Sequence, residues 1–359
     1  MHDVLLYALP VFVACMAAEW AWGRWRGRDT YRLADTLGSL SQGLLSQGVA
    51  VLTPLCQTGF YAAVHGRLAL LPATLWHGAV GVGAAVVVYD FCDYWLHRAS
   101  HESALFWAAH AVHHQSEHFN LSTALRQESL YAVMGWPFFL PMAVLGVPTS
   151  LYALAGTVVL FYQFWIHTEH VGRLGWLDGV LSTPSNHRVH HAVNPAYLDR
   201  NYGAIFVVWD RLFGSFAPET EPCVYGTVKP LASWHPLAGV GQFYAEMARR
   251  MKATPRWADK LRVLWKSPGW LPPGVPPPAE DALPRLARPR FDPPALPAAR
   301  ATAAILFLAV AAASGLWLAT ADDLGPLANL GAAAALTAGL CGVGMLLSRR
   351  VAEESSDGE

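Results

Sequence analysis

The sequence predicts an all-α fold, in which a polytopic bundle of membrane helices carries a histidine-rich helical domain at one end. First, 53% of the 359 residues are hydrophobic and only 14% are charged, with a mean hydropathy of +0.27, which is apolar for a soluble enzyme. Second, eleven of the fifteen histidines lie between His97 and His191. The net charge of −1 leaves no large basic surface, so we expect no nucleic-acid partner.

Long apolar runs indicate the candidate membrane spans, because a helix needs about 20 apolar residues to cross a bilayer core. One of these runs, residues 130–166, contains Pro137, Pro141 and Pro148. Proline interrupts helices, so we expect a hairpin of two short helices there. The candidate runs are 4–22, 36–64, 74–96, 130–145 with 150–166, 301–320 and 327–347.

Arginines indicate which end of the bundle faces the cytoplasm, since basic residues concentrate in cytoplasmic loops. Clusters follow the first and the last predicted spans, at Arg24, Arg26, Arg28, Arg32, Arg349 and Arg350. Alternating the spans from these clusters places the N-terminus outside and every histidine cluster on the cytoplasmic side. We therefore expect an integral, multi-pass membrane protein whose histidine-rich domain is cytosolic.

The composition divides the chain into five segments. Residues 268–297 are rich in proline, which favours extended structure and predicts a tether. The polar C-terminal residues predict disorder. The segments are N-terminal membrane helices (1–96), a histidine-rich core that includes the hairpin at about 130–166 (97–266), a proline-rich linker (267–300), a C-terminal membrane hairpin (301–348) and a disordered tail (349–359).

Three short runs, WLHRASHE, HAVHH and NHRVHH, place histidines at i, i+3 and i+4 spacings. Residues at these spacings lie on one face of a helix, so their rings can share a metal ion. His167, in the run HTEH at the end of a predicted span, is a further candidate, and the sequence leaves the roles of His118 and His170 open. The candidate ligands are His97, His101, His110, His113, His114, His167, His187, His190 and His191.

The number of clustered histidines predicts two metal ions, because one ion of four to six coordination cannot use so many nitrogens. Imidazole binds iron, zinc and copper alike, so ligand chemistry alone does not identify the metal. We favour two iron ions. The site is expected at the membrane face, where an apolar substrate would need oxidative attack on its C–H bonds. Amino-acid side chains alone cannot perform that chemistry, whereas metal-bound oxygen can.

The three runs resemble the motifs of the fatty acid hydroxylase and sterol desaturase superfamily of integral-membrane di-iron oxygenases. That superfamily carries HxxxH, HxxHH and a second HxxHH, which match in order over roughly residues 97–216. Stretches such as FWAAHAVHHQSEHFNLSTALRQE and FWIHTEH are most similar to the alkylglycerol monooxygenase subfamily, which oxidises ether lipids with tetrahydrobiopterin. The resemblance implies membrane helices capped by a cytosolic histidine-rich domain that holds a two-metal site. It also implies that Glu102 matters for activity.

Polar residues near the histidine runs are candidates for supporting roles. Asp90 and Asp93 lie near the end of a predicted span, where a buried carboxylate needs a partner. We favour a role for both as acceptors of ring N–H bonds from ligand histidines, over ion pairs with Arg98 or Arg126. We also expect Arg126 and Gln127 to contact a lipid headgroup or a reductant.

Other features of the histidine-rich region are expected to be structural. Ser182 or Thr183 can cap a helix that opens with Pro184, because a side-chain oxygen at this position accepts a free backbone N–H. A turn and an apolar run, AIFVVW, follow the last histidines. The polar residues around them, Asn201, Tyr202, Asp210 and Arg211, are expected to hold the domain together.

These observations predict a lipid monooxygenase that uses two iron ions, O2 and an external reductant, either tetrahydrobiopterin or an electron-transfer protein. The expected partners are a membrane lipid and this electron donor, and the sequence gives no indication of the oligomeric state. If the lipid is an ether, hydroxylation of the carbon next to the ether oxygen gives a hemiacetal, which breaks down to an aldehyde and an alcohol. Hydroxylation or desaturation of a sterol, fatty acid or carotenoid is the alternative within the superfamily.

Two other classes of function stay open at the level of sequence. A zinc-dependent membrane hydrolase also binds its metal through histidines and activates water. The zinc-protease motif HExxH is absent, however, since His101 and Glu102 are followed by Ser, Ala and Leu. A metal-storage protein is the second alternative, although helices that place ligands on fixed faces exceed what storage requires.

Overall fold

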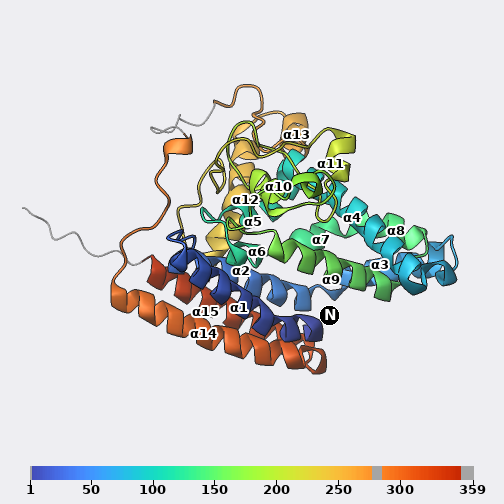
Figure 1. Ribbon diagram of the computed structural model, residues 1–359, viewed down its shortest axis with the longest axis horizontal. Coiled ribbons are helices and arrows are strands. Elements are labelled where there is room, and N and C mark those ends of the chain that lie inside the picture. The colour runs from blue at the N-terminus through green and yellow to red at the C-terminus, as the bar shows by residue number, and fades with distance from the viewer. Residues whose placement is uncertain (1, 277–284, 349–359) are drawn as a thin grey trace, which may run out of the picture.

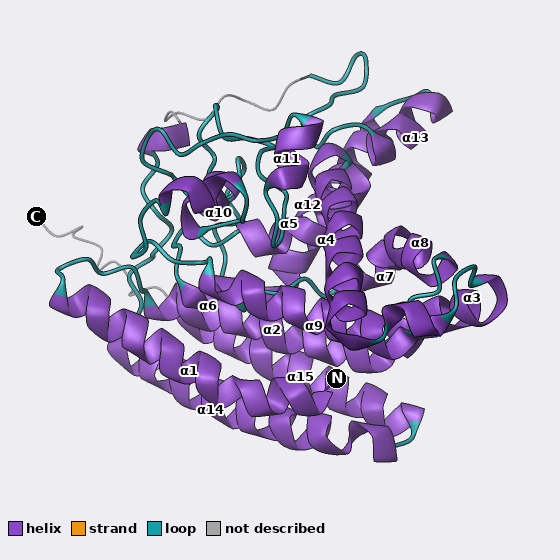
Figure 2. Ribbon diagram, turned by 45° about the vertical axis from the view of Figure 1, so that its right-hand side comes forward, coloured by secondary structure: helices purple, strands orange, loops and turns teal. Residues whose placement is uncertain are grey.

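The structure, a computed structural model, describes residues 2–276 and 285–348 (Figure 1). Within those residues the regular elements are helices, and paired β residues occur only in isolated bridges, such as those from Leu181 to Phe206 and from Ala192 to Tyr225 (Figure 2). The predicted all-α fold is therefore confirmed. Residues 277–284 of the predicted linker and the whole predicted tail, 349–359, lie outside the described residues.

The helices fall into three sets along the chain. The N-terminal set is α1 (His2–Trp25), α2 (Leu33–Leu52), the π-helical turn η1 (Leu55–Gly59), α3 (Phe60–Leu68), η2 (Ala73–Trp76) and α4 (Gly78–Glu102). The middle set is α5 (Ala104–His114), α6 (Leu121–Ala124), α7 (Tyr131–Gly135), η3 (Trp136–Phe139), α8 (Leu140–Val144), α9 (Thr149–Trp165), η4 (Gly175–Gly179), α10 (Pro184–His190), α11 (Val208–Phe213), α12 (Pro236–Ala253) and α13 (Trp257–Trp265). The C-terminal set is η5 (Arg285–Ala287), α14 (Pro297–Thr320), η6 (Ala321–Asp323) and α15 (Pro326–Leu347).

Three helices among the described residues are long and apolar enough to cross a membrane: α4, α14 with η6, and α15. They match the predicted spans at 74–96, 301–320 and 327–347. The predicted hairpin at about 130–166 is present as the short helices α7 and α8 followed by α9. Helix α1 covers the first predicted span but is not one of these three.

The predicted span at 36–64 is wrong as a single helix. Helix α2 ends at Leu52, and Pro54 precedes the π-helical turn that leads into α3. Proline lacks a backbone N–H and cannot continue the hydrogen-bond pattern of the preceding helix. In addition, α2 buries the polar side chains of Asp35, Ser39 and Gln42 against the rest of the protein. The segment is thus a partly buried helix followed by a bend.

One layer of the molecule consists of α1, α2, α14 and α15, which lie side by side and roughly parallel in both views (Figures 1 and 2). Its core is apolar and joins α2 to the C-terminal hairpin through Leu37, Leu45, Phe307, Leu336 and Leu340. Where helices lie in lipid, close packing of such side chains holds them together, because the lipid tails are as apolar as the core. The C-terminal hairpin therefore packs on the N-terminal part of the chain, far from it in sequence.

A second layer forms around α4, which packs against α5, α9 and the short helices of the hairpin. Its apolar core includes Tyr61, Phe139, Met142 and Leu151, and the Tyr61 hydroxyl donates to the carbonyl of Val147 at 2.8 Å. Because α4 is 25 residues long, its C-terminal turns extend past this core towards α5. The histidines of α4 are thereby carried into the histidine-rich region.

The histidine-rich region is held together by polar side chains, as predicted. The Thr183 side chain accepts a hydrogen bond from the backbone N–H of Asn186 and so caps α10, which opens with Pro184. The carboxylate of Asp210 accepts the backbone N–H of Tyr202 at 2.7 Å and of Gly203 at 2.8 Å. Buried backbone donors need such partners, so these contacts fix the loop between α10 and α11.

The described part of the predicted linker contacts the histidine-rich region and is more than a tether. Nη1 of Arg290 lies 3.1 Å from Nδ1 of His118. The backbone N–H of Phe291 donates to the carboxylate of Glu117, and the Phe291 ring packs on Trp234 with ring centroids 5.1 Å apart. The segment therefore joins the region of α5 to the start of α14.

Asp90, which we expected to accept ring N–H bonds from histidines, joins α4 to the loop before α11 instead. Its carboxylate accepts the backbone N–H of Ile205 at 2.6 Å, that of Phe206 at 3.2 Å and the indole N–H of Trp209 at 2.8 Å. The prediction for Asp90 is therefore wrong, because two backbone N–H groups and an indole N–H, and no histidine ring, donate to this buried carboxylate. Asp90 is completely buried, so no water can replace it.

Replacement of Asp90 by Ala should lower the stability of the protein without removing a candidate metal ligand. Three donors would lose their acceptor, and leaving a buried donor unpaired costs about 1–3 kcal/mol. We expect a clearly lower apparent melting temperature in detergent, measured by tryptophan fluorescence. The matched control is Asp322→Ala, because Asp322 is exposed in the turn between α14 and α15. Equal melting temperatures for the two variants would contradict this role of Asp90.

Candidate metal centre

Four helices bring the nine predicted histidine ligands together. The last turns of α4 carry His97 and His101, and α5 carries the HAVHH run. His167 follows the end of α9, and the NHRVHH run begins on α10 and ends at His191, the residue after this helix. All nine side chains are buried, with exposed fractions of 2–7%. Such burial of nine imidazoles requires a partner for each inward-facing nitrogen.

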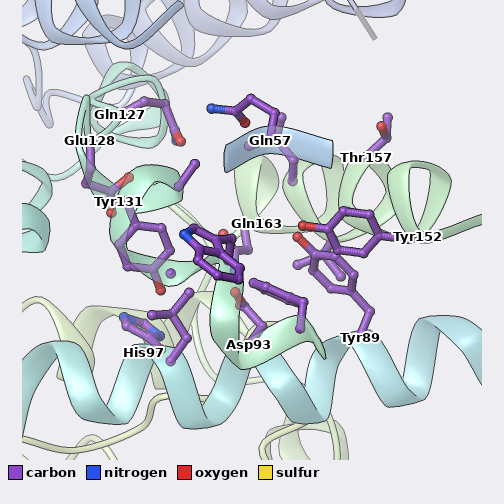
Figure 3. A pocket seen from close by; sticks show the side chains of 18 of the residues that line it. Gln57, Tyr89, Asp93, His97, Gln127, Glu128, Tyr131, Tyr152, Thr157 and Gln163 are labelled. Carbon is purple, nitrogen blue, oxygen red and sulfur yellow. The ribbon is translucent and has the colours of Figure 1, made fainter. Parts of the chain in front are cut away.

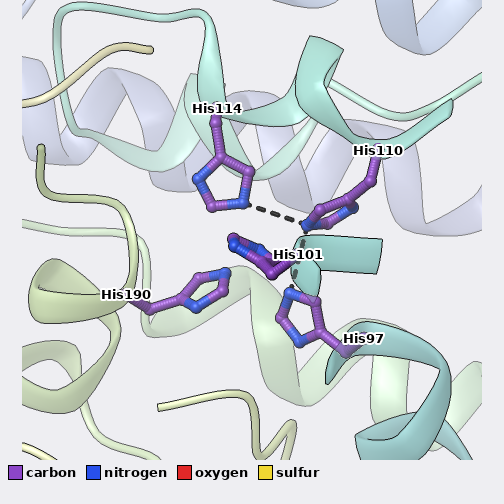
Figure 4. Close-up of side chains that lie close together, drawn as sticks. All are labelled: His97, His101, His110, His114 and His190. Atoms are coloured by element: carbon purple, nitrogen blue, oxygen red, sulfur yellow. Dashed lines mark hydrogen bonds between the residues drawn. The ribbon is translucent and has the colours of Figure 1, made fainter. Parts of the chain in front are cut away.

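The nine histidines form two groups, and the ligand nitrogens within each group lie within 4.8 Å of one another. Figure 4 shows the rings of the first group turned towards a common centre. Neither group contains a carboxylate or a thiol among the described residues. Group one is His97, His101, His110, His114 and His190, and group two is His113, His167, His187 and His191.

Backbone carbonyls determine which ring nitrogen carries the proton in four of these histidines. Because a carbonyl oxygen can only accept, each Nδ1 must hold the hydrogen and each Nε2 must present a lone pair. The Nδ1 atoms donate to Tyr202 (from His97, 2.8 Å), Arg126 (from His113, 2.9 Å), Gln163 (from His167, 2.7 Å) and Arg200 (from His190, 3.0 Å). The unprotonated Nε2 atoms of these four histidines therefore face the interiors of the two groups.

The inward-facing nitrogens cannot satisfy one another. Nε2 of His113 lies 3.2 Å from Nε2 of His167, and both atoms present lone pairs, so no hydrogen joins them. Nε2 of His187 lies 2.9 Å from Nε2 of His167. In group one, Nε2 of His101 and Nε2 of His190 have no hydrogen-bond partner at all. Converging buried lone pairs of this kind fit a cation.

The spacing between the nitrogens also fits a metal. Two nitrogens bound at about 2.0–2.1 Å and at right angles to one ion lie about 3 Å apart. In group one, Nε2 of His110 lies 3.1 Å from Nε2 of His97 and 3.0 Å from Nε2 of His114. In group two, Nε2 of His191 lies 3.1 Å from Nε2 of His187. Each group therefore has the donor atoms and the spacing of a site for a transition-metal ion.

Burial keeps these histidines neutral, which is the form that binds metal. The pKa of His113 falls to about 4, mainly because burial disfavours the imidazolium. Burial, together with the neighbouring histidines, lowers the pKa of His110, His114, His190 and His191 well below the ordinary value. At neutral pH their nitrogens are therefore free of the proton that would compete with a metal.

A cavity of about 270 Å³ reaches both histidine groups (Figure 3). It lies between α4, η1, the hairpin helices and α9, and His97, His110, His113 and His187 line its inner end. Tyrosines, Trp136 and Phe139 supply much of the remaining wall, with Asp93, Glu128 and several glutamines among them. An organic molecule in this cavity would therefore lie beside both groups.

Glu128 is the functional candidate that the sequence interpretation missed. Its carboxylate lies 2.7 Å from Nδ1 of His110, and its side chain lines the cavity. Burial raises the pKa of Glu128 to about 8, and Asp93 acts in the same direction. A cation held by Nε2 of His110 would favour the ionised carboxylate, because His110 then keeps its proton on Nδ1. The available signal was an isolated glutamate at the start of an apolar hairpin.

The other predicted site residues lie in different surroundings. Asp93 lines the cavity and contacts the side chain of Gln163, with no hydrogen bond to a histidine ring. Glu102 is half exposed and forms an ion pair with Arg98 at 2.9 Å, so it belongs to neither histidine group. Gln127 lines the cavity and donates to the carbonyl of Ala124.

Arg126 is buried, and its side chain does not line the large cavity. Its guanidinium donates to the carbonyl of Val112 at 2.6 Å and to the side chain of Gln115 at 3.1 Å. The contribution of Arg126 to the centre is its backbone carbonyl, which accepts from His113. His118 and His170 lie outside both groups, since His118 contacts Arg290 and His170 lies 3.3 Å from the Thr30 hydroxyl.

Variants of single ligands should separate the two groups. Replacing His110 by Ala removes a nitrogen from group one, and replacing His187 by Ala removes one from group two. We expect about two metal ions per wild-type chain and about one per chain in each variant, measured by inductively coupled plasma mass spectrometry. The matched control is His170→Ala, which should bind as much metal as the wild type. Full metal content in both ligand variants would contradict this assignment.

Metal binding should persist below the ordinary histidine pKa. The ligands stay neutral until the pH approaches their lowered pKa values, so the metal content should be the same after dialysis at pH 6 and at pH 7.5. Loss should begin only as the pH falls towards about 4, the pKa of His113. Release of half of the metal between pH 7 and pH 6 would show that the ligands titrate like exposed histidines.

Comparison with known proteins gives relatives of stated activity. The chain is 38% identical to the alkylglycerol monooxygenase of Xenopus tropicalis over 278 residues. These residues make up 76% of this chain and 60% of the relative. It is 38% identical over 274 residues to the alkylglycerol monooxygenase of Homo sapiens, which covers 75% of this chain and 60% of the relative. It is 28% identical over 215 residues to the ornithine lipid hydroxylase OlsE of Rhizobium tropici. This match covers 55% of this chain and 61% of the relative.

The shared region includes the histidine groups. The chain spans about three fifths of the length of the curated relatives that it matches. No solved structure matches the chain. Residues 82–215, which contain all nine histidines of the two groups, match the model of the family described as Fatty acid hydroxylase. Through these residues the chain matches the fatty acid hydroxylase family.

Proposed function

We propose that this chain is an integral-membrane monooxygenase that binds two iron ions and hydroxylates a C–H bond of a membrane lipid with O2. The observation that carries the proposal is the convergence of nine buried histidines in two groups, with two members of each group lining one cavity. The relatives named as monooxygenase and hydroxylase support the same reaction class. The two groups are close enough in the fold for both to face one substrate, since His110 and His113 lie on one helix.

Within this proposal, the side chains of the protein position the metal ions and the substrate. Iron bound at the two groups would supply the O2 chemistry that side chains lack. The carbonyls of Tyr202, Arg126 and Gln163 hold the ligand rings in one tautomer, which keeps Nε2 available. The buried surroundings of the groups exclude water that would compete with the substrate.

The cavity wall combines aromatic and aliphatic side chains with polar ones, which suits a lipid with an apolar chain and a polar group. Its wall lies between α4, a candidate membrane span, and the hairpin of α7, α8 and α9. Aromatic side chains, including Tyr89, Trp136 and Phe139, supply apolar surface along its length. A lipid chain in this cavity would bring a C–H bond next to His97 and His113, at the inner end. We propose that this end faces the cytoplasm, in agreement with the arginines after the first and last predicted spans.

An ether lipid is the substrate class that the named relatives favour, because two of them are alkylglycerol monooxygenases. Oxidation of the carbon next to the ether oxygen would release an aldehyde and an alcohol. The electrons would come from an external reductant, either tetrahydrobiopterin or an electron-transfer protein. Sterols, fatty acids and carotenoids are the alternative substrates, and the ornithine lipid hydroxylase shows that a polar lipid is also within reach of a relative.

A zinc-dependent hydrolase is the alternative outside this reaction class. The donor atoms of both groups are compatible with zinc, whose bound water would act as the nucleophile. Catalytic zinc sites in hydrolases commonly combine histidines with a carboxylate, whereas neither group contains one among the described residues. The geometry therefore favours the oxygenase.

Oxygen uptake by the purified protein tests the proposal directly. With iron and a reductant, we expect consumption of O2 that requires an alkylglycerol, with formation of the aldehyde followed by mass spectrometry. Replacement of His113 by Ala should lower the rate at least about 100-fold, because one ligand of group two is lost. Activity with zinc alone, independent of O2, would instead establish the hydrolase. No change in alkylglycerols, fatty acids, sterols or carotenoids would contradict the proposal.

The cavity wall gives a second prediction. Gly156 of α9 lines the cavity, and a Cβ atom there would lie 2.9 Å from the hydroxyl of Tyr89. Replacement of Gly156 by Val should push the Tyr89 ring into the cavity and raise KM several-fold, with the metal content unchanged. The matched control is Gly331→Val on α15, where a Cβ atom meets nothing within 4 Å. Equal KM values for the two variants would argue against this cavity as the substrate site.

A further inference from the structure

The two histidine groups differ in the partners of their outward-facing nitrogens. In group two, the Nδ1 atoms of His113 and His167 donate to backbone carbonyls, and Nδ1 of His187 has no partner. In group one, two Nδ1 atoms face carboxylates: His110 faces Glu128 at 2.7 Å, and His101 faces Asp199 at 3.5 Å. Both carboxylate partners therefore lie against the same group.

Glu128 is the stronger of these two partners. Its distance to Nδ1 of His110 is that of a charge-assisted hydrogen bond, and its side chain is only 11% exposed. Asp199 lies beyond hydrogen-bond distance of His101, and its side chain is 58% exposed, so water screens its charge. The only other carboxylate that lines the cavity in the described residues, Asp93, contacts Gln163 and no histidine.

We propose that Glu128 is a positioning residue that distinguishes the metal position of group one from that of group two, beyond the difference between five and four histidines. This inference rests on the proposed function, since it assumes that each group holds an iron ion. A carboxylate that accepts Nδ1–H fixes the ring of His110 and makes its Nε2 a more basic ligand than one whose Nδ1 donates to a carbonyl. An ion bound in group one would therefore receive more electron density from its ligands than an ion bound in group two.

Unequal ions have a consequence for how the protein receives electrons. More basic ligands stabilise the higher oxidation state, so the ion in group one should have the lower reduction potential. Glu128 also lines the cavity, beside His110. Glu128 therefore contacts a ligand of group one and the cavity that both groups reach.

Mössbauer spectroscopy of protein loaded with iron-57 tests this role, because it reports on each ion separately. We expect two doublets of equal area from the reduced wild-type protein. Replacement of Glu128 by Gln keeps an acceptor near His110 but removes the charge, and it should shift only one doublet and weaken binding of one ion about 10–100-fold. Replacement by Ala leaves His110 without an acceptor and should reduce the iron content from two per chain to one.

The matched controls are two other carboxylates near the centre. Asp93→Asn removes a charge from the same cavity without touching a ligand, and Asp199→Asn removes the distant partner of His101. Both should leave the two doublets and the iron content as in the wild type. Because the controls are also buried or adjacent to the site, a shift that they share with Glu128→Gln would overturn the specific role of Glu128.

The remaining outcomes separate this inference from the proposed function. Two bound irons whose doublets are unchanged by Glu128→Gln would overturn the inference and leave the monooxygenase proposal intact. A wild-type protein that takes up no iron would overturn both. One shifted doublet, with the other unchanged and both controls like the wild type, would support the assignment of Glu128.

Discussion

The crowding of nine imidazoles into two groups, in which the ligand nitrogens lie within 4.8 Å of one another, is the constraint on which the rest of this structure depends. Lone pairs of buried nitrogens repel when no proton or cation lies between them, so a fold that assembles them must offset that cost. Burial holds the rings neutral, and backbone carbonyls hold them in the tautomer that points the lone pair inward. A metal ion bound in each group would replace this repulsion with coordination.

Much of the polar network outside the two groups holds their helices in place. Arg188, which lies between two ligands on α10, pairs with Glu219 at 2.7 Å and donates to the carbonyl of Thr168, next to His167. Glu19 of α1 accepts the hydroxyl of Thr168 and the backbone N–H of Leu121. Contacts of this kind link the N-terminal helix to the ligand segments. The layer of α1, α2, α14 and α15 is therefore joined directly to the metal centre.

The parts of the fold that follow from local pattern could be predicted from the sequence. The i, i+3, i+4 spacing placed His110, His113 and His114 on one helix face, and the capping residue before Pro184 opened α10 as expected. The apolar run at 36–64 misled because hydropathy does not register the break at Pro54. Hydropathy also does not show that the polar side chains of α2 are buried within the protein.

Contacts between distant segments were the parts that could not be predicted. Glu128 meets His110 only because the loop after α6 folds back on α5, and nothing in its neighbourhood in the sequence indicates this. Arg126 was expected to act through its charge, yet the structure uses its carbonyl. Asp90 met backbone donors from residues more than a hundred positions away. In each case the tertiary fold decided the partner, which residue type alone did not indicate.

Anomalous diffraction from crystals of iron-loaded protein, recorded on both sides of the iron absorption edge, tests the central claim most directly. The account predicts two peaks of similar height, one among the Nε2 atoms of group one and one among those of group two. A single peak, a peak outside these nine histidines, or a signal that appears only at the zinc edge would contradict it.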